Sequence, residues 1–352
     1  MSADDERRNR APFSPTEPQA ERAPGFAETV TEEGQRIVID PFTWNRRELA
    51  KRLPLSHAWP AEVDVAATLK KLGITSQSET GLPVPRTIVA GVFLVASLPA
   101  HSYLIDCGPE GLALIDPGLS ANFDAIVSNI EALGFAASSL RWVLNTHAHF
   151  DHSMASHRFR DTGAMIFAFG ADADAIEKAT RATVSFLLPP ADQAAYPTCK
   201  VDRRLSDGEE LRLGNRTFHT IHVPGHTEGS CAFLLRNGGL DLLFAGDVVL
   251  FDHRLAAQAL PYTDNQRYLA SLQKLATFSL TMSEPIRWDL LLPGHGALVL
   301  ERAYLDVTKA WRTVQSNLLM GDPVEALPFH TYAYRLAMFG RPATAWTPQN
   351  DF

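Results

Sequence analysis

The sequence predicts an α/β protein whose sheets are covered by helices on their outer faces. Apolar segments with strand-like alternation and β-branched residues occur in both halves of the chain, and segments with helical periodicity lie between them. The 352 residues, 45% of them hydrophobic, are enough for one large domain with attachments.

Most of the expected strands are short apolar segments bounded by glycine, proline or polar turn residues. Strands are expected at 36–41, 87–97, 102–107, 112–118, 142–145, 164–169, 210–214, 217–223, 231–235, 240–246 and 288–293. Helices are expected at 63–73, 123–133, 171–179 and 265–276, with a Pro-rich insertion at 180–204. No internal repeat is visible in this order of elements.

Changes of composition divide the chain into four parts. Residues 1–36 are polar and Pro-rich and are expected to form a flexible tail, because they have little apolar surface to bury. Residues 37–85 form an N-terminal extension, and 86–299 form the main domain. Residues 300–352 have helical character with breaks at Gly-Asp-Pro and Leu-Pro, and we expect a helical cap beside the site.

Charge and cysteine content narrow the class of protein. Net charge is −8 without a block of Lys and Arg, which argues against nucleic acid and, more weakly, against an anionic membrane surface. No apolar run could span a bilayer, and the first 25 residues lack the apolar segment of a secretory signal. Cys107, Cys199 and Cys231 form no CxxC pair, which is typical of a reducing compartment. We expect a cytoplasmic protein that acts on a small molecule, with homo-oligomer formation left open.

The segment 145–152, Asn-Thr-His-Ala-His-Phe-Asp-His, carries the strongest chemical signal. It lies at the end of an apolar strand, and alternation on extended backbone points His147 and His149 the same way. Asp151 and His152 then turn toward a second point as a helix begins. Imidazole and carboxylate are ligands that suit zinc, and four such groups crowded together are hard to explain as core packing.

Three further motifs repeat this design, in which a buried strand delivers one ligand onto a loop. They are Pro-Gly-His226-Thr-Glu-Gly-Ser, Phe-Ala-Gly-Asp247 and Leu-Pro-Gly-His295-Gly. The adjacent glycines let the backbone approach closely. Each motif alone is common, but all four in this order indicate a metal centre.

The four motifs together resemble those of the metallo-β-lactamase superfamily over residues 87–296. The resemblance implies a four-layer αβ/βα sandwich with the metal site between the ends of the sheets. It implies one metal ion at His147, His149 and His226, a second at Asp151, His152 and His295, and Asp247 as the bridge. This ligand set is similar to that of glyoxalase-II-like hydrolases, lactonases and lactamases without a cysteine ligand. It departs from the diiron flavoprotein branch, which has Glu where His149 stands.

The ligand set implies hydrolytic chemistry. Two Zn²⁺ ions are expected, with iron or manganese as alternatives. A metal pair lowers the pKa of a bridging water, and the resulting hydroxide attacks a carbonyl that one metal polarises. Asp247 would hold the metals at their working separation. Asp151 would orient the hydroxide and relay its proton.

Other residues are assigned supporting roles. Asp116 is expected to accept a hydrogen bond from a metal-ligating histidine. His101 and His253 are candidate substrate contacts at the pocket mouth, and Trp311 is a third on the C-terminal helix, with core packing as its alternative. Packing or surface roles are expected for His157, His219 and His222, and a buried structural thiol for Cys231. Phe329, Tyr332 and Tyr334 are expected to line the substrate pocket with Trp311, with packing of the C-terminal helices onto the core as the alternative.

The substrate is less defined than the site, because the fold supports many reactions. Leu250 stands where acyl-homoserine lactonases carry Tyr, no secretory signal supports a lactamase, and no basic surface supports a nuclease. Hydrolysis of a small carboxylic ester, lactone or thioester is therefore predicted. The alternatives are a mononuclear iron persulfide dioxygenase, a β-lactam or phosphoester hydrolase, and a binding protein without turnover.

Overall fold

The computed structural model describes residues 27–31, 33–39, 82–187, 196–251, 255, 258, 262–280 and 284–320. The expected helix at 63–73, His253 and the aromatic residues at 329–334 lie outside these ranges. No helix in the described part of the chain is long and apolar enough to cross a bilayer.

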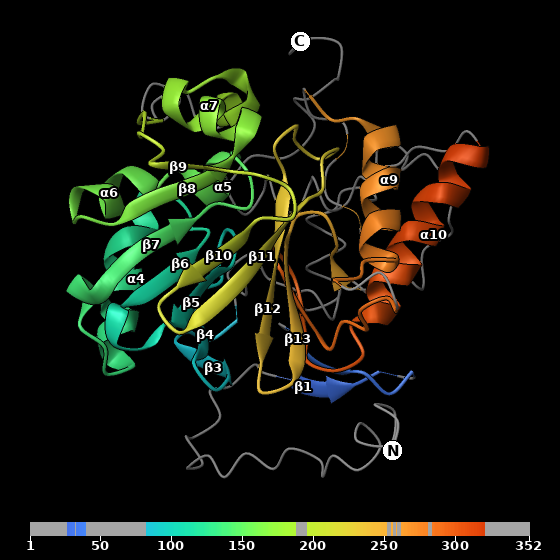
Figure 1. Cartoon of the computed structure of the whole chain (residues 1–352), viewed down its shortest axis with the longest axis horizontal. Coiled ribbons are helices and arrows are strands. Elements are labelled where there is room, and N and C mark those ends of the chain that lie inside the picture. The colour runs from blue at the N-terminus through green and yellow to red at the C-terminus, as the bar shows by residue number, and fades with distance from the viewer. Residues whose placement is uncertain are drawn as a thin grey trace, which may run out of the picture.

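The strands form two mixed sheets (Figure 1). The eight-stranded sheet has the order β1 (Ala27–Val30), β2 (Arg36–Ile39), β15 (Leu298–Val299), β14 (Leu290–Pro293), β13 (Leu240–Gly246), β12 (Cys231–Asn237), β11 (Arg216–His222) and β10 (Glu210–Leu213). Its strands are antiparallel except for the pair β13 and β14.

The seven-stranded sheet follows chain order. Its strands are β3 (Arg86–Val89), β4 (Val92–Ala96), β5 (Ser102–Asp106), β6 (Leu112–Ile115), β7 (Leu140–Leu144), β8 (Met165–Phe169) and β9 (Arg203–Leu205). The pairs from β3 to β6 are antiparallel, and those from β6 to β9 are parallel. The expected strand at 87–97 is thus a hairpin, with Gly91 at φ 73° in its turn.

Helices cover the outer face of each sheet, so the molecule has the four layers that the sequence predicts. α4 (Phe123–Ala132), α5 (Phe150–Ser153), α6 (Ser156–Asp161) and α7 (Gly170–Lys178) lie on the side of the seven-stranded sheet, and α9 (Asn265–Ala276) and α10 (Tyr304–Met320) on the side of the eight-stranded sheet (Figure 1). α9 covers the residues that the helical pattern predicted.

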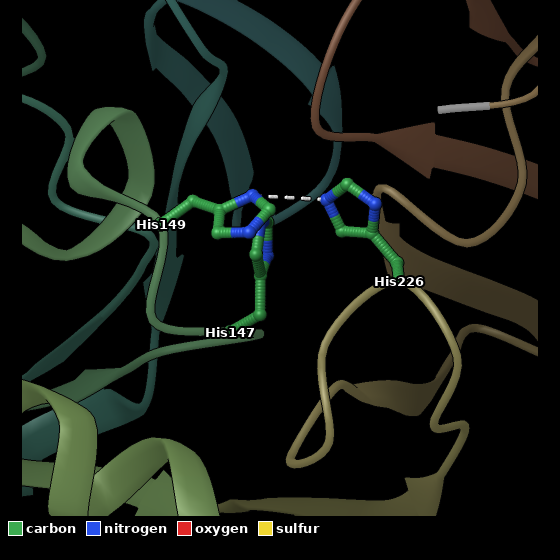
Figure 2. Close-up of side chains that lie close together, drawn as sticks. All are labelled: His147, His149 and His226. Carbon is green, nitrogen blue, oxygen red and sulfur yellow. Dashed lines mark hydrogen bonds between the residues drawn. The ribbon is translucent and has the colours of Figure 1, made fainter. Parts of the chain in front are cut away.

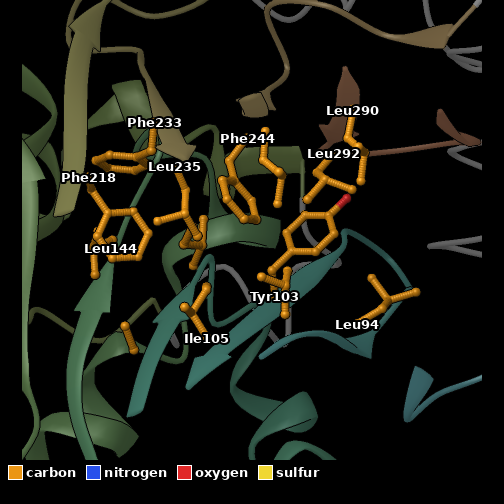
Figure 3. Close-up of a cluster of buried hydrophobic side chains, with 14 of the residues drawn as sticks. Leu94, Tyr103, Ile105, Leu144, Phe218, Phe233, Leu235, Phe244, Leu290 and Leu292 are labelled. Atoms are coloured by element: carbon orange, nitrogen blue, oxygen red, sulfur yellow. The ribbon is translucent and has the colours of Figure 1, made fainter. Parts of the chain in front are cut away.

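The central core lies between the sheets (Figure 3). Alternation along β13 explains how one apolar strand serves two layers: Leu242 and Phe244 face the central core, whereas Leu243 and Ala245 pack in the cluster under α9 and α10. Burial on both faces is the reason that the strands read as continuous apolar runs.

The N-terminal segment differs from the expected flexible tail at residues 27–36. β1 pairs with β2, and β2 pairs with β15 at Leu298 and Val299. Backbone hydrogen bonds hold β1 to β2, so β1 needs few apolar side chains and resembles a tail in composition. β2 carries the buried Ile37, Val38 and Ile39 and matches the strand expected at 36–41. Gln35 adds a buried link by donating from Nε2 to Asp306 Oδ2 at 2.7 Å.

Candidate metal centre

The ligand motifs all emerge where strands end at one edge of the sandwich. β7 leads into residues 145–149 and the short helix α5, and β11 leads into the loop that carries His226. Asp247 directly follows β13, and His295 lies two residues after β14. Because β13 and β14 are parallel neighbours, their two loops lie side by side.

The first group consists of His147, His149 and His226, all buried (Figure 2). His149 Nδ1 and His226 Nε2 are 3.0 Å apart. One ring nitrogen from each of the three imidazoles lies within 4.8 Å of the others. Figure 2 shows that two of these side chains come from one loop and the third from the facing loop. Three convergent nitrogens are a suitable set for a zinc-like cation.

The second group consists of Asp151, His152 and His295. The Nε2 atoms of His152 and His295 are 3.1 Å apart, and His295 Nε2 is 3.3 Å from Asp151 Oδ2. His152 Nδ1 lies 2.9 Å from Asp116 Oδ2, and His295 Nδ1 lies 2.9 Å from the carbonyl oxygen of Pro99. Each Nδ1–H therefore donates outward, so that the two Nε2 lone pairs face one another. Neutral lone pairs at this distance repel, and a cation or a proton between them relieves the repulsion.

Asp247 lies between the two groups. Its Oδ2 is 3.6 Å from His226 Nε2 and 3.4 Å from His295 Nε2, and its Oδ1 is 3.5 Å from His152 Nε2. Gly294 makes this arrangement possible, because a Cβ there would collide with Asp247 Oδ1 and lie 2.6 Å from His152 Cε1.

The donor atoms fit bound metal ions. His147 Nε2, His149 Nε2 and Asp247 Oδ1 are buried and find no hydrogen-bond partner among the described residues. Leaving buried polar atoms unpaired costs roughly 1–3 kcal/mol each. Nitrogen and carboxylate oxygen are ligands of zinc and of related transition metals. Cations at the two groups would satisfy atoms that the protein itself leaves unpaired.

The pKa values show the same division into two groups. Burial and neighbouring imidazoles hold the pKa of His147 and His149 well below the usual range. Burial alone would lower the pKa of His152 and His295, but the carboxylates of Asp151 and Asp247 raise it. The carboxylates of the second group therefore favour positive charge there, whereas the first group consists of uncharged imidazoles.

Asp116 lies where the sequence analysis placed it, beside a histidine of the site. Its carboxylate accepts from His152 Nδ1 at 2.9 Å and from Thr146 Oγ1 and Thr146 N, each at 2.7 Å. A left-handed φ of 54° at Asp116 turns this side chain under the loop. These three hydrogen bonds fix the carboxylate, which in turn orients His152 through its Nδ1 atom, on the side of the ring away from His295.

His101 is the candidate substrate contact that the structure places near the second group. The imidazole is buried, and its Nδ1 is 3.1 Å from the Pro293 carbonyl oxygen. Burial first, then the nearby His295 imidazole, lowers the pKa of His101 to about 3. Its backbone N–H also donates to the Gly294 carbonyl oxygen at 2.7 Å, so His101 braces the His295 loop from the opposite sheet.

The remaining candidates do not join the site. Trp311 packs on the outer cluster with Val307 and Val314, which matches the packing alternative. His157 Nδ1 lies 2.9 Å from the Met154 carbonyl oxygen. His222 stacks on Phe169, His219 lies beside Glu210, and Cys231 is a buried free thiol.

The sequence analysis missed one buried carboxylate. Asp172, at the start of α7, accepts hydrogen bonds from both loops of the first group. The signal was its position four residues before Ile176, on the buried face of an otherwise unremarkable helix.

The family model of the metallo-beta-lactamase superfamily matches residues 97–295. This match covers more than half of the chain, and it agrees with the fold and with the placement of the motifs. The protein belongs to the metallo-beta-lactamase superfamily.

Similar proteins of known name are hydrolases. The chain is 30% identical to the hydroxyacylglutathione hydrolase GloC of Haemophilus influenzae, over 58% of this chain and 88% of that protein. It is 29% identical to the acyl-coenzyme A thioesterase MBLAC2 of Gallus gallus, over 43% and 54% of the two chains. For the hydroxyacylglutathione hydrolase of Rhodospirillum rubrum the identity is 27%, over 42% and 47%. The chain thus spans about half the length of the last two relatives.

Solved structures agree on the fold. A metallo-beta-lactamase of Cronobacter sakazakii, mutated in its HARLDQ motif, has a TM-score of 0.53 and 25% identity, over 68% of this chain and 98% of that one. The subclass B3 metallo-beta-lactamase BJP-1 of Bradyrhizobium japonicum has a TM-score of 0.53 and 24% identity, over 69% and 94%. The protein has this fold, and the named relatives that it resembles are hydrolases.

Proposed function

We propose that the protein is a di-metal hydrolase of small carboxylic esters, lactones or thioesters, with thioesters as the first class to test. The observation that carries the proposal is the pair of three-ligand groups with Asp247 between them. The thioester preference rests on the relatives named as an acyl-coenzyme A thioesterase and hydroxyacylglutathione hydrolases.

The proposal includes two metal positions. His147, His149 and His226 would hold the first ion, Asp151, His152 and His295 the second, and Asp247 would contact both. Zn²⁺ is proposed, with iron or manganese as alternatives. Bound there, a metal pair would polarise a carbonyl oxygen and lower the pKa of water so that hydroxide forms at neutral pH.

The chain's own groups orient the site and move the proton. Asp116 fixes His152 with Nε2 toward the site, and the Pro99 carbonyl oxygen does the same for His295. Burial would raise the pKa of Asp151, but the imidazoles of His152 and His295 lower it below the usual range. Asp151 is therefore ionised at neutral pH and can accept a proton from the attacking water.

Metal analysis and substrate screening test this function together. Purified protein should carry close to two metal equivalents and hydrolyse at least one thioester, ester or lactone from a broad panel. A β-lactam and a phosphodiester belong in the same panel as the alternative substrates. One iron per chain with oxygen uptake on a persulfide, and no hydrolysis, would replace this proposal by the dioxygenase alternative.

A further inference from the structure

Asp172 is a buried carboxylate that belongs to neither metal group. It lies in the first turn of α7, and 2% of its surface is exposed. Oδ2 accepts from the backbone N–H of Ala148 and from Thr227 Oγ1, each at 2.7 Å, and Oδ1 accepts from the backbone N–H of Gly229 at 2.7 Å. These distances are short for hydrogen bonds from N–H, as expected for an ionised acceptor.

The donors flank every ligand of the first position. Ala148 lies between His147 and His149, and Thr227 directly follows His226. One carboxylate therefore ties the loop after β7 to the loop after β11, two loops from different sheets. Gly229 is required for this contact, because a Cβ there would lie 2.6 Å from both the backbone nitrogen and Oδ1 of Asp172.

The second position is oriented by other groups. His152 Nδ1 donates a hydrogen bond to Asp116, and His295 Nδ1 donates one to the Pro99 carbonyl oxygen. The hydrogen bonds of Asp172 go to the segments that carry the first group, and none of those described reaches residues 294–296. Asp116 also accepts from Thr146, whose Oγ1 lies 3.0 Å from His147 Nδ1, so Asp116 supports ligands of both positions. The described hydrogen bonds of Asp172 reach the first position alone.

An ionised carboxylate is costly at this place. Burial raises the pKa of Asp172 to about 6 despite its three hydrogen bonds. A neutral side chain could join two loops without that cost. A cation bound by His147, His149 and His226 would attract the Asp172 carboxylate. This attraction would offset part of the free-energy cost of removing the carboxylate from water.

We propose that Asp172 is a positioning residue that sets the metal affinity of the first position and leaves the second position nearly unchanged. The inference rests on the proposed metal centre. In this inference Thr227 and Gly229 of the His226 motif serve as the hydrogen-bond donors that connect the His226 loop to Asp172.

Zn²⁺ titration in single-position backgrounds tests the inference. His295→Ala leaves the first position intact, and His226→Ala leaves the second. Competition with a chromophoric chelator gives the Zn²⁺ affinity of each background with and without Asp172→Asn. We expect Asp172→Asn to weaken the first position roughly tenfold or more, and to change the second by less than about threefold.

A matched control is Asp202→Asn. Asp202 Oδ2 also accepts a backbone N–H, from Ile166 at 3.0 Å near the start of β8, while Oδ1 pairs with Arg160. This variant should leave both affinities unchanged. Equal losses at both positions in Asp172→Asn, or no loss at either, would overturn the inference.

A second pair of variants keeps the test valid if Asp172→Asn does not fold. In the His295→Ala background, Thr227→Val removes the hydroxyl donor at nearly constant volume, whereas Thr227→Ser keeps it. Weaker Zn²⁺ binding in Thr227→Val with near-normal binding in Thr227→Ser supports the brace, and equal binding in the two contradicts it. Wild-type protein that binds no Zn²⁺, iron or manganese would instead refute the proposed function itself.

Discussion

The two proposed metal positions differ in ligand chemistry and in their access to solvent. The first has three imidazoles, and the His226 side chain is 1% exposed. The second includes the Asp151 carboxylate, and the His295 side chain is 14% exposed. Burial and neighbouring imidazoles hold the pKa of His147 and His149 below its ordinary value, so both rings are uncharged at neutral pH, whereas the carboxylates of Asp151 and Asp247 raise the pKa of His152 and His295. The first group is thus uncharged and enclosed, and the second contains His295, the one partly exposed residue of the set.

The comparison predicts unequal losses when single ligands are removed. His147→Ala should empty the first position, where Asp247 also binds, and abolish hydrolysis. His295→Ala should leave one metal equivalent bound with a smaller loss of hydrolysis. Metal analysis by mass spectrometry, with initial rates on the best substrate, measures both. Full activity in His147→Ala would show that the ligand assignment is wrong.

Asp247→Asn should lower kcat by orders of magnitude while the fold is retained. The substitution keeps the volume of the side chain but removes the negative charge that faces both groups. Metal content should fall at both positions, and circular dichroism should stay near that of the wild type. A variant that loses metal from one position only would show that Asp247 is no bridge.

Graded chelation should empty the second position before the first. Its ligand His295 is the most exposed residue of the set, and a proton can replace the departing cation there. Stepwise addition of a chelator, followed by metal analysis and activity, should show loss of activity with about one equivalent still bound. Release of both equivalents in one step would remove the distinction drawn between the positions.

Trp311→Ala should have the smallest effect on either position. Trp311 packs on the cluster under α9 and α10, so the cost is one of stability, roughly 2 kcal/mol for a partly buried tryptophan. Thermal unfolding should show the loss, while KM and metal content stay at wild-type values. A raised KM with normal stability would restore Trp311 to the substrate contacts expected from the sequence.

The ligand motifs could be predicted because each combines a buried strand with a polar residue beside glycine or in a dense cluster. His147 to His152, His226, Asp247 and His295 converge as their strand ends require, and Asp116 was found by the same logic. Asp172 could not be found in this way. Its partners lie 24, 55 and 57 residues away, and its role exists only once the two loops meet.

The N-terminal strands show a second kind of limit. β1 has the composition of a tail because it is held by pairing with β2, and pairing leaves little trace in the hydropathy of one strand, whereas the apolar β2 was expected as a strand. Trp311 shows a further limit. An apolar helix face indicates that the face is buried, but it does not indicate whether the core, a partner or a substrate covers it.

The pairing of β2 with β15 has a consequence for the order in which the protein becomes active during synthesis. Residues 36–39 meet residues 298–299, and Gln35 meets Asp306 across 271 positions. His147, His149 and His226 leave the ribosome well before the His295 loop, which follows β14 and precedes β15. Contacts of such separation close slowly and late. The His295 loop therefore reaches its final place only when residues 36–39 and 298–299 have joined into one sheet.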